Sequence, residues 1–429
     1  MNARDFKNRH DKEFINSLQK FNLFENSSNK EFLLSLLDYW LYSVSALHFS
    51  YDKESLSKFS ASPINNPIRW SFSYEFGTDS EIQNRLLGLN FFSIGLSLLL
   101  KVHLPGGPLS KMLDKFILKI SVLLVTHIPI RIDKSKSELV KRFVSHYFEN
   151  MKINVDEKLI QKIPGVFQSK TFKLFSNFPL KVSCSPHAFM DFIGFEKIFL
   201  LNKKIIVEGF QHGGGYGLFE TDYYSLYEKD LSNKFFGWGF LEDNIKQSKY
   251  KKTNLKIGKK RLVWLERPCF PKTLKLLNEG QYIQYKSPEV LSSISKSLRS
   301  IEGDYFNLTY PGSYKSEDYE GYRGKIINRE NVNAEDIIAL DDIVILDCSA
   351  ASIIHFLVLN SISFILILDR RSEPFFTSKH AEWIALLMEN GLCFFENQID
   401  EIQHSITHLL SDSYILPEII EEKHKIFFL

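Results

Sequence analysis

A glycine-rich segment lies near the middle of the chain, directly after a candidate strand. Residues 211–217 read Gln-His-Gly-Gly-Gly-Tyr-Gly. Successive glycines permit positive φ and close backbone approach, so their N–H groups can converge on an anionic oxygen. We expect Gly213, Gly214 and Gly215 to bind a ligand there. We expect His212 to serve as a general base, a general acid or a hydrogen-bond donor to a phosphate. The alternative is a tight turn with a surface histidine.

Two carboxylates follow the glycine-rich segment. Glu220 and Glu228 could orient His212 or accept the proton of an acceptor hydroxyl. The alternative is that they are ordinary surface carboxylates, because most of those do neither. Both are candidate catalytic residues.

A second candidate site follows the apolar run at residues 343–346, where a strand, a turn and a helix are predicted in succession. Asp347, Ser349 and Ser352 are residue types that cap helices, and a helix start offers unpaired N–H groups and a positive dipole end to a phosphate. Ligands of open α/β sheets bind beyond the carboxyl ends of the strands, where this turn is expected. The alternative is an ordinary capped helix without a ligand.

A third polar segment follows the predicted strand at 305–310. A Pro-Gly pair after Tyr310 predicts a turn, again on the carboxyl side of a sheet. Tyr310 and Arg323 could reach a nucleotide base or its phosphates, Arg323 through a bidentate fork. A polar surface loop is the equal alternative.

The chain of 429 residues exceeds the roughly 250–300 residues over which one core keeps growing, which favours two domains. Apolar residues at three-to-four spacing predict an amphipathic helix over 30–47, and the first 160 residues are expected to be mostly helical. From about residue 181, short β-rich runs alternate with helical segments, which indicates parallel β-α-β units.

The predicted fold is α/β, with two Rossmann-like lobes and a helical N-terminal elaboration. Residues 1–250 form the expected acceptor-side lobe and residues 251–400 the donor-binding lobe, with an interdomain linker at 248–260. A helical tail at 401–429, beginning near Ile399, is expected to pack back across the cleft. The fold requires strands 205–210 and 343–346 to lie in different sheets.

Composition narrows the class of protein. The formal charge of +2, with 44% hydrophobic and 24% charged residues, indicates a globular chain and gives no sign of a nucleic-acid partner. The cysteines are far apart, and no signal-type apolar region follows the charged N-terminus, so we expect a cytoplasmic protein without structural zinc or disulfides. The apolar runs 86–100 and 353–368 are shorter than the ~18–20 residues of a spanning helix and are interpreted as core.

The segment 211–217, Glu228 with the Trp-Gly pair at 238–239, and the Asp347-x-Ser-x-x-Ser pattern with Asn360 together resemble a family of transferases from bacterial surface-polysaccharide (O-antigen and capsule) gene clusters. The chain is also distantly similar to capsule-type Kdo transferases and glycerophosphotransferases of GT-B architecture. The similarity covers roughly residues 160–400. Three positions depart from the family pattern, namely Asn233, Thr309 and His355.

The resemblance implies a metal-independent glycosyltransferase without a cofactor. It would move a sugar or sugar acid from a nucleotide-activated donor to a surface polysaccharide or glycolipid, at the inner face of the membrane, where an apolar surface would give peripheral contact. No Asp-x-Asp pair follows a strand, because Asp341 and Asp342 precede theirs. The first alternative is a catalytically silent binding or assembly protein of the same pathway, suggested by the three departures. The second is a hydrolase using His212, although no G-x-S-x-G elbow accompanies it.

Overall fold

The chain forms two compact units, each described by itself below. The computed structural model describes residues 2–25, 27, 29–50, 132–154, 160, 163, 165–169, 180–184, 205–211, 215–237, 245–246, 255, 260–265, 274–285, 287–299, 301, 305–309, 325–328, 334–411 and 416–428. The first unit contains residues 1–210 and 224–236, and the second contains residues 211–223 and 237–429. Both units contain parallel β-sheet, so the protein is of the mixed α/β class.

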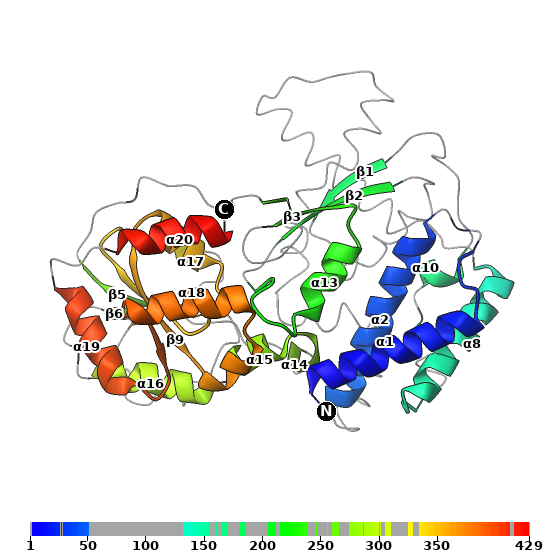
Figure 1. Ribbon diagram of the computed structural model, residues 1–429, viewed down its shortest axis with the longest axis horizontal. Coiled ribbons are helices and arrows are strands. Elements are labelled where there is room, and N and C mark those ends of the chain that lie inside the picture. Colours follow the sequence, from blue (N-terminus) through cyan, green and yellow to red (C-terminus); the bar gives the residue numbers. More distant parts are fainter. Residues whose placement is uncertain are drawn as a thin grey trace, which may run out of the picture. The chain divides into compact units, whose positions relative to one another are not determined.

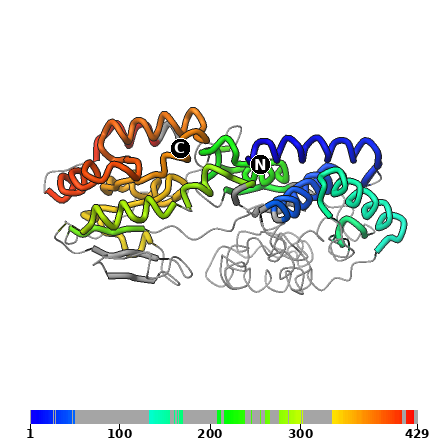
Figure 2. Tube along the Cα trace, turned by 90° about the horizontal axis from the view of Figure 1, so that it is seen from below, coloured from blue at the N-terminus to red at the C-terminus, as the bar shows by residue number. Residues whose placement is uncertain are grey.

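Helices dominate the N-terminal part of unit 1, as predicted. They are α1 (Ala3–Lys20), α2 (Lys30–Ser50), α8 (Lys134–Asn150) and α10 (Gly165–Gln168), and they pack as one group (Figures 1 and 2). Two of them begin at side-chain caps, because Asn2 accepts a hydrogen bond from the Asp5 N–H and Asp133 accepts from the N–H groups of Ser135 and Lys136. Their shared interior is aromatic, and its fully buried members include Phe6, Trp40, Phe143 and Phe148.

One buried histidine ties three of these helices together. His10 of α1 is fully buried, and its ring nitrogens lie 2.6 Å from a carboxylate oxygen of Asp38 in α2 and 2.5 Å from the Tyr147 hydroxyl in α8. Ser45 of α2 lies 3.1 Å from the same hydroxyl. Burial raises the pKa of Tyr147, so this phenol is neutral. A polar network satisfied in this way fixes how the helices pack against one another.

Unit 1 continues with helix α13 (Tyr223–Asp230) and strands β1 (Leu180–Cys184), β2 (Ile205–Phe210) and β3 (Lys234–Gly237). Strands β1, β2 and β3 run parallel and are neighbours in that order, and the short β4 (Ile245–Lys246) follows β3 in the chain. Asn233 joins β2 to β3, because its N–H donates to the Val207 carbonyl and its side-chain oxygen accepts from the Val207 N–H. Asn233 therefore has a structural role between these two strands.

Unit 2 is built on a six-stranded parallel sheet. Its strands are β5 (Leu262–Leu265), β6 (Tyr305–Thr309), β7 (Lys325–Asn328), β8 (Ile343–Leu346), β9 (Ser363–Leu368) and β10 (Cys393–Phe395). Their spatial order is β10-β9-β8-β5-β6-β7. When the strands are counted from β5, this is the 3-2-1-4-5-6 order of doubly wound nucleotide-binding folds, and the order reverses between β5 and β8.

Strands β5, β8, β9 and β10 are buried along nearly their whole length, which explains why they are continuously apolar rather than alternating. One face packs against α16 (Pro288–Arg299) and α19 (Ile399–Leu410), where Trp264, Ile345 and Ile367 meet Ile294 and Ile406. Helices α17 (Ile353–Leu359), α18 (Ser378–Glu389) and α20 (Glu418–Phe428) form a second group that contacts β9 and β10 (Figure 1).

An ion pair links the two central strands, β5 and β8, at the amino edge of the sheet. Arg261 precedes β5 and Asp342 precedes β8, and the guanidinium donates to both carboxylate oxygens at 2.8 and 2.7 Å. Asp342 is fully buried and also accepts from the Ala339 N–H. Its carboxylate is thus engaged in the frame of the sheet, at the edge opposite to the one where ligands of such sheets bind.

Several predictions about domains can now be compared with the units. Strands 205–210 and 343–346 lie in different sheets, as predicted. The predicted boundary at residue 250 differs from the structure, because residues 211–223 belong to unit 2 through long-range hydrogen bonds. The tail at 401–429 also belongs to unit 2, since α19 packs against α16 and α20 against α17 and α18. Most of the predicted linker at 248–260 lies outside the described residues.

No helix of the described part of the chain is long and apolar enough to cross a membrane. The apolar run at 353–368 consists of helix α17 followed by strand β9, both with buried side chains, which confirms its interpretation as core. The other run, at 86–100, lies outside the described residues.

Candidate functional site

The second half of the glycine-rich segment is a defined turn. Gly217 has a φ of 69°, which lies in the left-handed region that favours glycine. Its N–H donates to a carboxylate oxygen of Asp222 over 3.0 Å, and Asp222 is buried. The predicted need for glycine is confirmed at this position. His212, Gly213 and Gly214 lie outside the described residues.

The turn is fastened to the segment that follows the carboxyl end of β9. Phe219 and Phe376 form an antiparallel bridge, and the Glu220 N–H donates to the Phe375 carbonyl over 2.8 Å. Thr377 donates its N–H to the Leu218 carbonyl over 3.0 Å. The Thr377 hydroxyl donates to the Gly217 carbonyl over 3.0 Å. Because β9 ends at Leu368 and the 3-10 helix η5 (Arg370–Phe375) follows at once, the turn lies at the carboxyl edge of the six-stranded sheet.

His380, in the first turn of α18, makes a further hydrogen bond to the glycine-rich turn. Its Nδ1 lies 2.9 Å from the Leu218 carbonyl oxygen, an acceptor only, so the ring donates from this nitrogen. Burial lowers the pKa of His380 to about 3, and the hydrogen bond to the carbonyl offsets only part of that effect. The imidazole is therefore neutral and acts as a fixed hydrogen-bond donor.

Helix α15 (Glu279–Tyr285) contacts the glycine-rich turn on another side. A Cβ placed on Gly215 would lie 3.0 Å from both Nε2 and Oε1 of Gln281. Gly280 is packed still more tightly, since its Cβ would lie 2.3 Å from a ring carbon of Phe219 and 2.8 Å from the Phe375 Cβ. The contact therefore requires glycine at residue 280, whereas at residue 215 a Cβ would meet only the end of the Gln281 side chain.

The same helix reaches the turn after β8. The side-chain oxygen of Gln284 accepts from the Ser349 N–H at 2.9 Å and from the Ser349 hydroxyl at 3.1 Å. Its amide nitrogen donates to the Ser372 hydroxyl at 3.2 Å. Gln284 is fully buried. Two candidate motifs that are far apart in sequence, 211–217 and 347–352, are thus joined by one short helix within unit 2.

The predicted phosphate-binding residues lie where β8 ends, at the point where the strand order reverses. Asp347 and Ser349 are buried there. The helix begins later than predicted, at Ile353, and Ser352 makes no side-chain capping bond, because its φ of −60° and ψ of −21° are already helical. In this structure both Ser349 donors are directed at Gln284.

The remaining predicted residues are dispersed. Glu220 is exposed beside the glycine-rich turn in unit 2, whereas Glu228 is fully buried in α13 of unit 1. The two candidate carboxylates therefore differ in burial and lie in different units. Tyr310 directly follows the last residue of β6 but, like Arg323, lies outside the described residues. His355 is buried, and its Nδ1 lies 3.0 Å from Nε2 of His424 in α20.

Sequence reasoning missed four residues that hold the candidate site together, namely Gln281, Gln284, Thr377 and His380. One signal was present, since a Thr three residues before a His at the start of an apolar helix is typical of a capped N-terminus, and Thr377 does accept from the His380 N–H. The two glutamines carry no such signal. Their partners are contributed by segments about 65 residues away in both directions along the chain.

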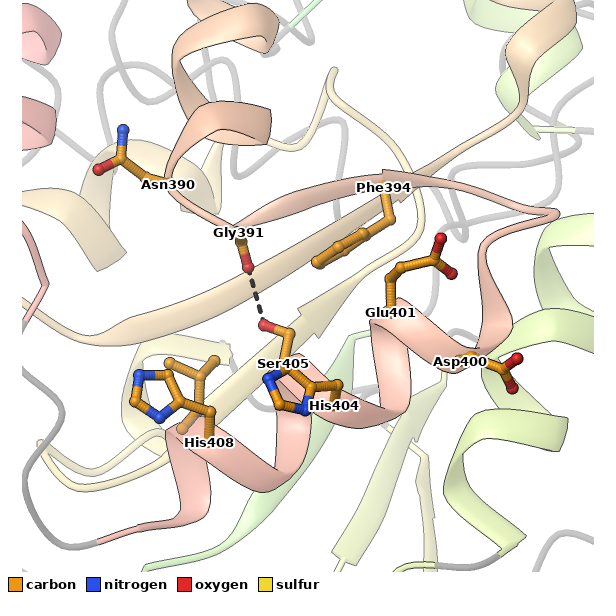
Figure 3. Close-up of a pocket in the computed structure, with 9 residues that line it drawn as sticks. Asn390, Gly391, Phe394, Asp400, Glu401, His404, Ser405 and His408 are labelled. Atoms are coloured by element: carbon orange, nitrogen blue, oxygen red, sulfur yellow. Dashed lines mark hydrogen bonds between the residues drawn. The ribbon is translucent and has the colours of Figure 1, made fainter.

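A separate hollow of about 430 Å³ lies beside α19. Figure 3 shows Asp400, Glu401, His404 and His408 along this helix, opposite Asn390 and Phe394, with the Ser405 hydroxyl bonded to the Gly391 carbonyl. None of its lining residues comes from 211–220, 274–285 or 347–352. Among the described residues, no group of three or more His, Cys, Asp or Glu side chains is placed to hold a metal ion.

Comparison with known proteins adds no relative to this description. The chain matches no family model, no curated protein and no solved structure.

Proposed function

We propose that this protein is a metal-independent glycosyltransferase that moves a sugar or sugar acid from a nucleotide-activated donor to a surface polysaccharide or glycolipid acceptor. One observation carries the proposal. The glycine-rich turn is held at the carboxyl edge of a parallel sheet with 3-2-1-4-5-6 order, and α15 joins it to the turn at the reversal point. That edge is where doubly wound sheets bind nucleotides.

The donor would bind across this edge. Residues 213–215 would face the phosphates through their N–H groups. Tyr310 directly follows β6 in the sequence, on the carboxyl side of that strand, and stays a candidate for the base or the phosphates. Arg323 precedes β7 in the sequence, so its candidacy rests on its residue type alone. Metal independence rests on the sequence, in which no Asp-x-Asp pair follows a strand.

Unit 1 is proposed as the acceptor-side lobe of a GT-B-like enzyme. Its parallel sheet with a helical N-terminal group is the kind of second lobe that such an enzyme requires. We further propose that the enzyme acts in the cytoplasm at the inner face of the membrane, because a lipid-linked acceptor would be presented there.

The proposed reaction is a simple displacement. The acceptor hydroxyl oxygen forms a bond to the anomeric carbon of the donor, and the bond from that carbon to the phosphate oxygen breaks. His212 or Glu220 accepts the hydroxyl proton, and the nucleotide leaves with its phosphate. Convergent N–H groups stabilise the charge that develops on the leaving phosphate.

The alternative, a catalytically silent binding or assembly protein, is favoured by one observation. Both Ser349 donors are hydrogen-bonded to Gln284 inside the protein, so neither donor is available to a phosphate in this arrangement. A silent protein of this kind would keep the fold but have no need of free phosphate donors.

A thermal-shift screen with UDP-, GDP-, CDP- and CMP-activated sugars distinguishes the two. We expect a rise in the melting temperature with the donors of one nucleotide class, because a ligand that binds only the folded state stabilises it by mass action. The absence of a shift with every nucleotide would reject the transferase proposal in favour of the alternative. Release of free sugar without an acceptor would instead indicate a hydrolase.

A further inference from the structure

The carboxamide of Gln281 lies broadside against Gly215. A Cβ on this glycine would lie 3.0 Å from Nε2, 3.0 Å from Oε1 and 3.1 Å from Cδ of Gln281. Three atoms of one planar group are equally distant only if the plane of the group faces that position. The hydrogen-bonding edge of the carboxamide is therefore directed along the glycine-rich turn rather than into it.

Part of that hydrogen-bonding edge is already used. Nε2 of Gln281 donates to the Tyr285 hydroxyl over 2.9 Å. A primary amide has two N–H donors and an oxygen with two lone pairs, so one N–H and the oxygen remain. Within the described part of the chain these two groups have no partner, and Gln281 is half-buried, so a ligand lying over the turn could reach them.

The backbone that carries Gln281 is fixed on both sides. Gly280 is wedged against Phe219 and Phe375, and Gln284 is tied to Ser349 and Ser372 by buried hydrogen bonds. The Gln281 N–H is itself bonded to the Asn278 side chain at 3.1 Å. The Gln281 side chain is itself held by its hydrogen bond to Tyr285, so it loses less rotamer entropy on binding than a free side chain would.

We infer that Gln281 binds hydroxyl groups of the sugar that is transferred. This inference rests on the proposed function and adds the residue that recognises the sugar. A sugar hydroxyl both donates and accepts, so it can use the remaining N–H and the oxygen of the amide, whereas an anionic phosphate oxygen only accepts and could use the N–H alone. The neutral amide against Gly215 therefore contacts the uncharged part of the donor.

The test separates the sugar from the nucleotide. Gln281→Met keeps the length of the side chain and removes its hydrogen bonds. Affinities are measured by calorimetry for the nucleotide sugar that shifts the wild-type protein most and for the same nucleotide without its sugar. We expect the nucleotide sugar to bind about 10-fold more weakly to the variant, as two neutral hydrogen bonds are lost. The affinity for the bare nucleotide should change less than about twofold.

Gln403→Met on α19 is the matched control, because Gln403 is a half-buried helical glutamine outside the proposed site. It should leave both affinities unchanged. Equal weakening for nucleotide and nucleotide sugar would overturn the inference and assign Gln281 to the nucleotide, and unchanged affinity for both would overturn it as well. If Gln281→Met does not fold, Gln281→Leu, which is also uncharged and lacks hydrogen-bonding groups, is measured in the same way.

A wild-type protein that binds no nucleotide sugar of the panel would instead reject the proposed function itself. The two failures are therefore distinguishable, since one appears in the wild-type protein and the other only in the comparison of variants.

Discussion

Gln284 accepts two hydrogen bonds from Ser349 on a single oxygen, at 2.9 Å from the backbone nitrogen and 3.1 Å from the hydroxyl. Both residues are buried, and the geometry fixes helix α15 to the turn after the central strand β8. Since the neighbouring Gln281 lies against Gly215, this contact links the turn after β8 to the glycine-rich turn, which backbone hydrogen bonds also hold to the segment after β9.

Replacing Gln284 should destabilise unit 2. Gln284→Leu leaves the N–H and the hydroxyl of Ser349 buried without their acceptor, at about 1–3 kcal/mol for each such group, whereas the Ser372 hydroxyl keeps its bond to the Asp369 carbonyl. We expect a loss of about 3 kcal/mol in the free energy of unfolding, measured by urea titration. Gln403→Leu, at a half-buried position, should cost less than about 0.5 kcal/mol. A Gln284→Leu variant as stable as this control would show that α15 is held by packing alone.

The two glycines at the α15 contact should differ in their tolerance of alanine. Gly280→Ala would drive a methyl group into the Phe219 ring and should cost about 2–3 kcal/mol, since neither neighbour can move away. Gly215→Ala should cost about 1 kcal/mol, because it displaces only the end of Gln281. In a Gln281→Ala background that cost should disappear. Urea titration of the single and double variants measures these changes in unfolding free energy. If Gly215→Ala remained destabilising in the Gln281→Ala background, the added methyl group would clash with another residue.

Stability should fall with acid because His380 cannot be protonated in the folded state. Its pKa of about 3 is below the value of about 6.5 expected when unfolded, so the unfolded chain gains protons first as the pH falls. The stabilisation is complete above about pH 6.5 and is lost progressively towards pH 3. Between pH 7.5 and pH 5 the loss from this residue is at most about 2 kcal/mol.

The corresponding variant is His380→Gln, which can still donate to the Leu218 carbonyl but does not titrate. Its unfolding free energy should change less between pH 7.5 and pH 5 than that of the wild-type protein. His404→Gln on the exposed face of α19 is the control and should keep the wild-type pH dependence. Identical pH profiles for all three proteins would mean that another group causes the acid sensitivity.

The Arg261–Asp342 pair should contribute to the frame of the sheet rather than to ligand binding. Asp342→Ala should cost about 2–3 kcal/mol, somewhat less than for a wholly buried pair because Arg261 remains partly exposed to water. In a double-mutant cycle, Arg261→Ala combined with Asp342→Ala should cost less than the sum of the single changes. Strict additivity of the measured unfolding energies would show that the pair does not interact.

His212 remains the candidate for the reacting centre. If it acts as a general acid or base, His212→Ala should lower turnover about 10²–10⁴-fold with donor affinity nearly kept. Glu220→Gln tests the exposed carboxylate beside the same turn by the same two measurements. Full turnover in His212→Ala would remove the chemistry from this turn and leave it a role in binding.

The sequence by itself determined the local elements of the protein. The strands near 205–210, 305–310 and 343–346, the helix over 30–47 and the helix beginning at Ile399 were predicted, because apolar spacing depends only on neighbouring residues. Strands β7 and β10 were not predicted. The positive φ of Gly217 was likewise expected, since glycine is the residue that tolerates it. The separation of β2 and β8 into two sheets was predicted from the length of the chain, which favours two domains, and from the alternation of strands with helices in each of them.

Only the tertiary structure decided which segments meet. Nothing in residues 211–223 indicates that they pack on Phe375, Thr377 and His380 rather than with the domain that precedes them in sequence, because hydrogen bonds between distant backbone groups leave no periodic signal. The same holds for Ser349, whose residue type favours a helix cap but whose donors are taken by Gln284 from 65 residues away. The preference of a side chain for a helix cap is worth a fraction of a kcal/mol to about 1 kcal/mol. Leaving a buried donor without its long-range hydrogen bond costs about 1–3 kcal/mol, which outweighs that preference.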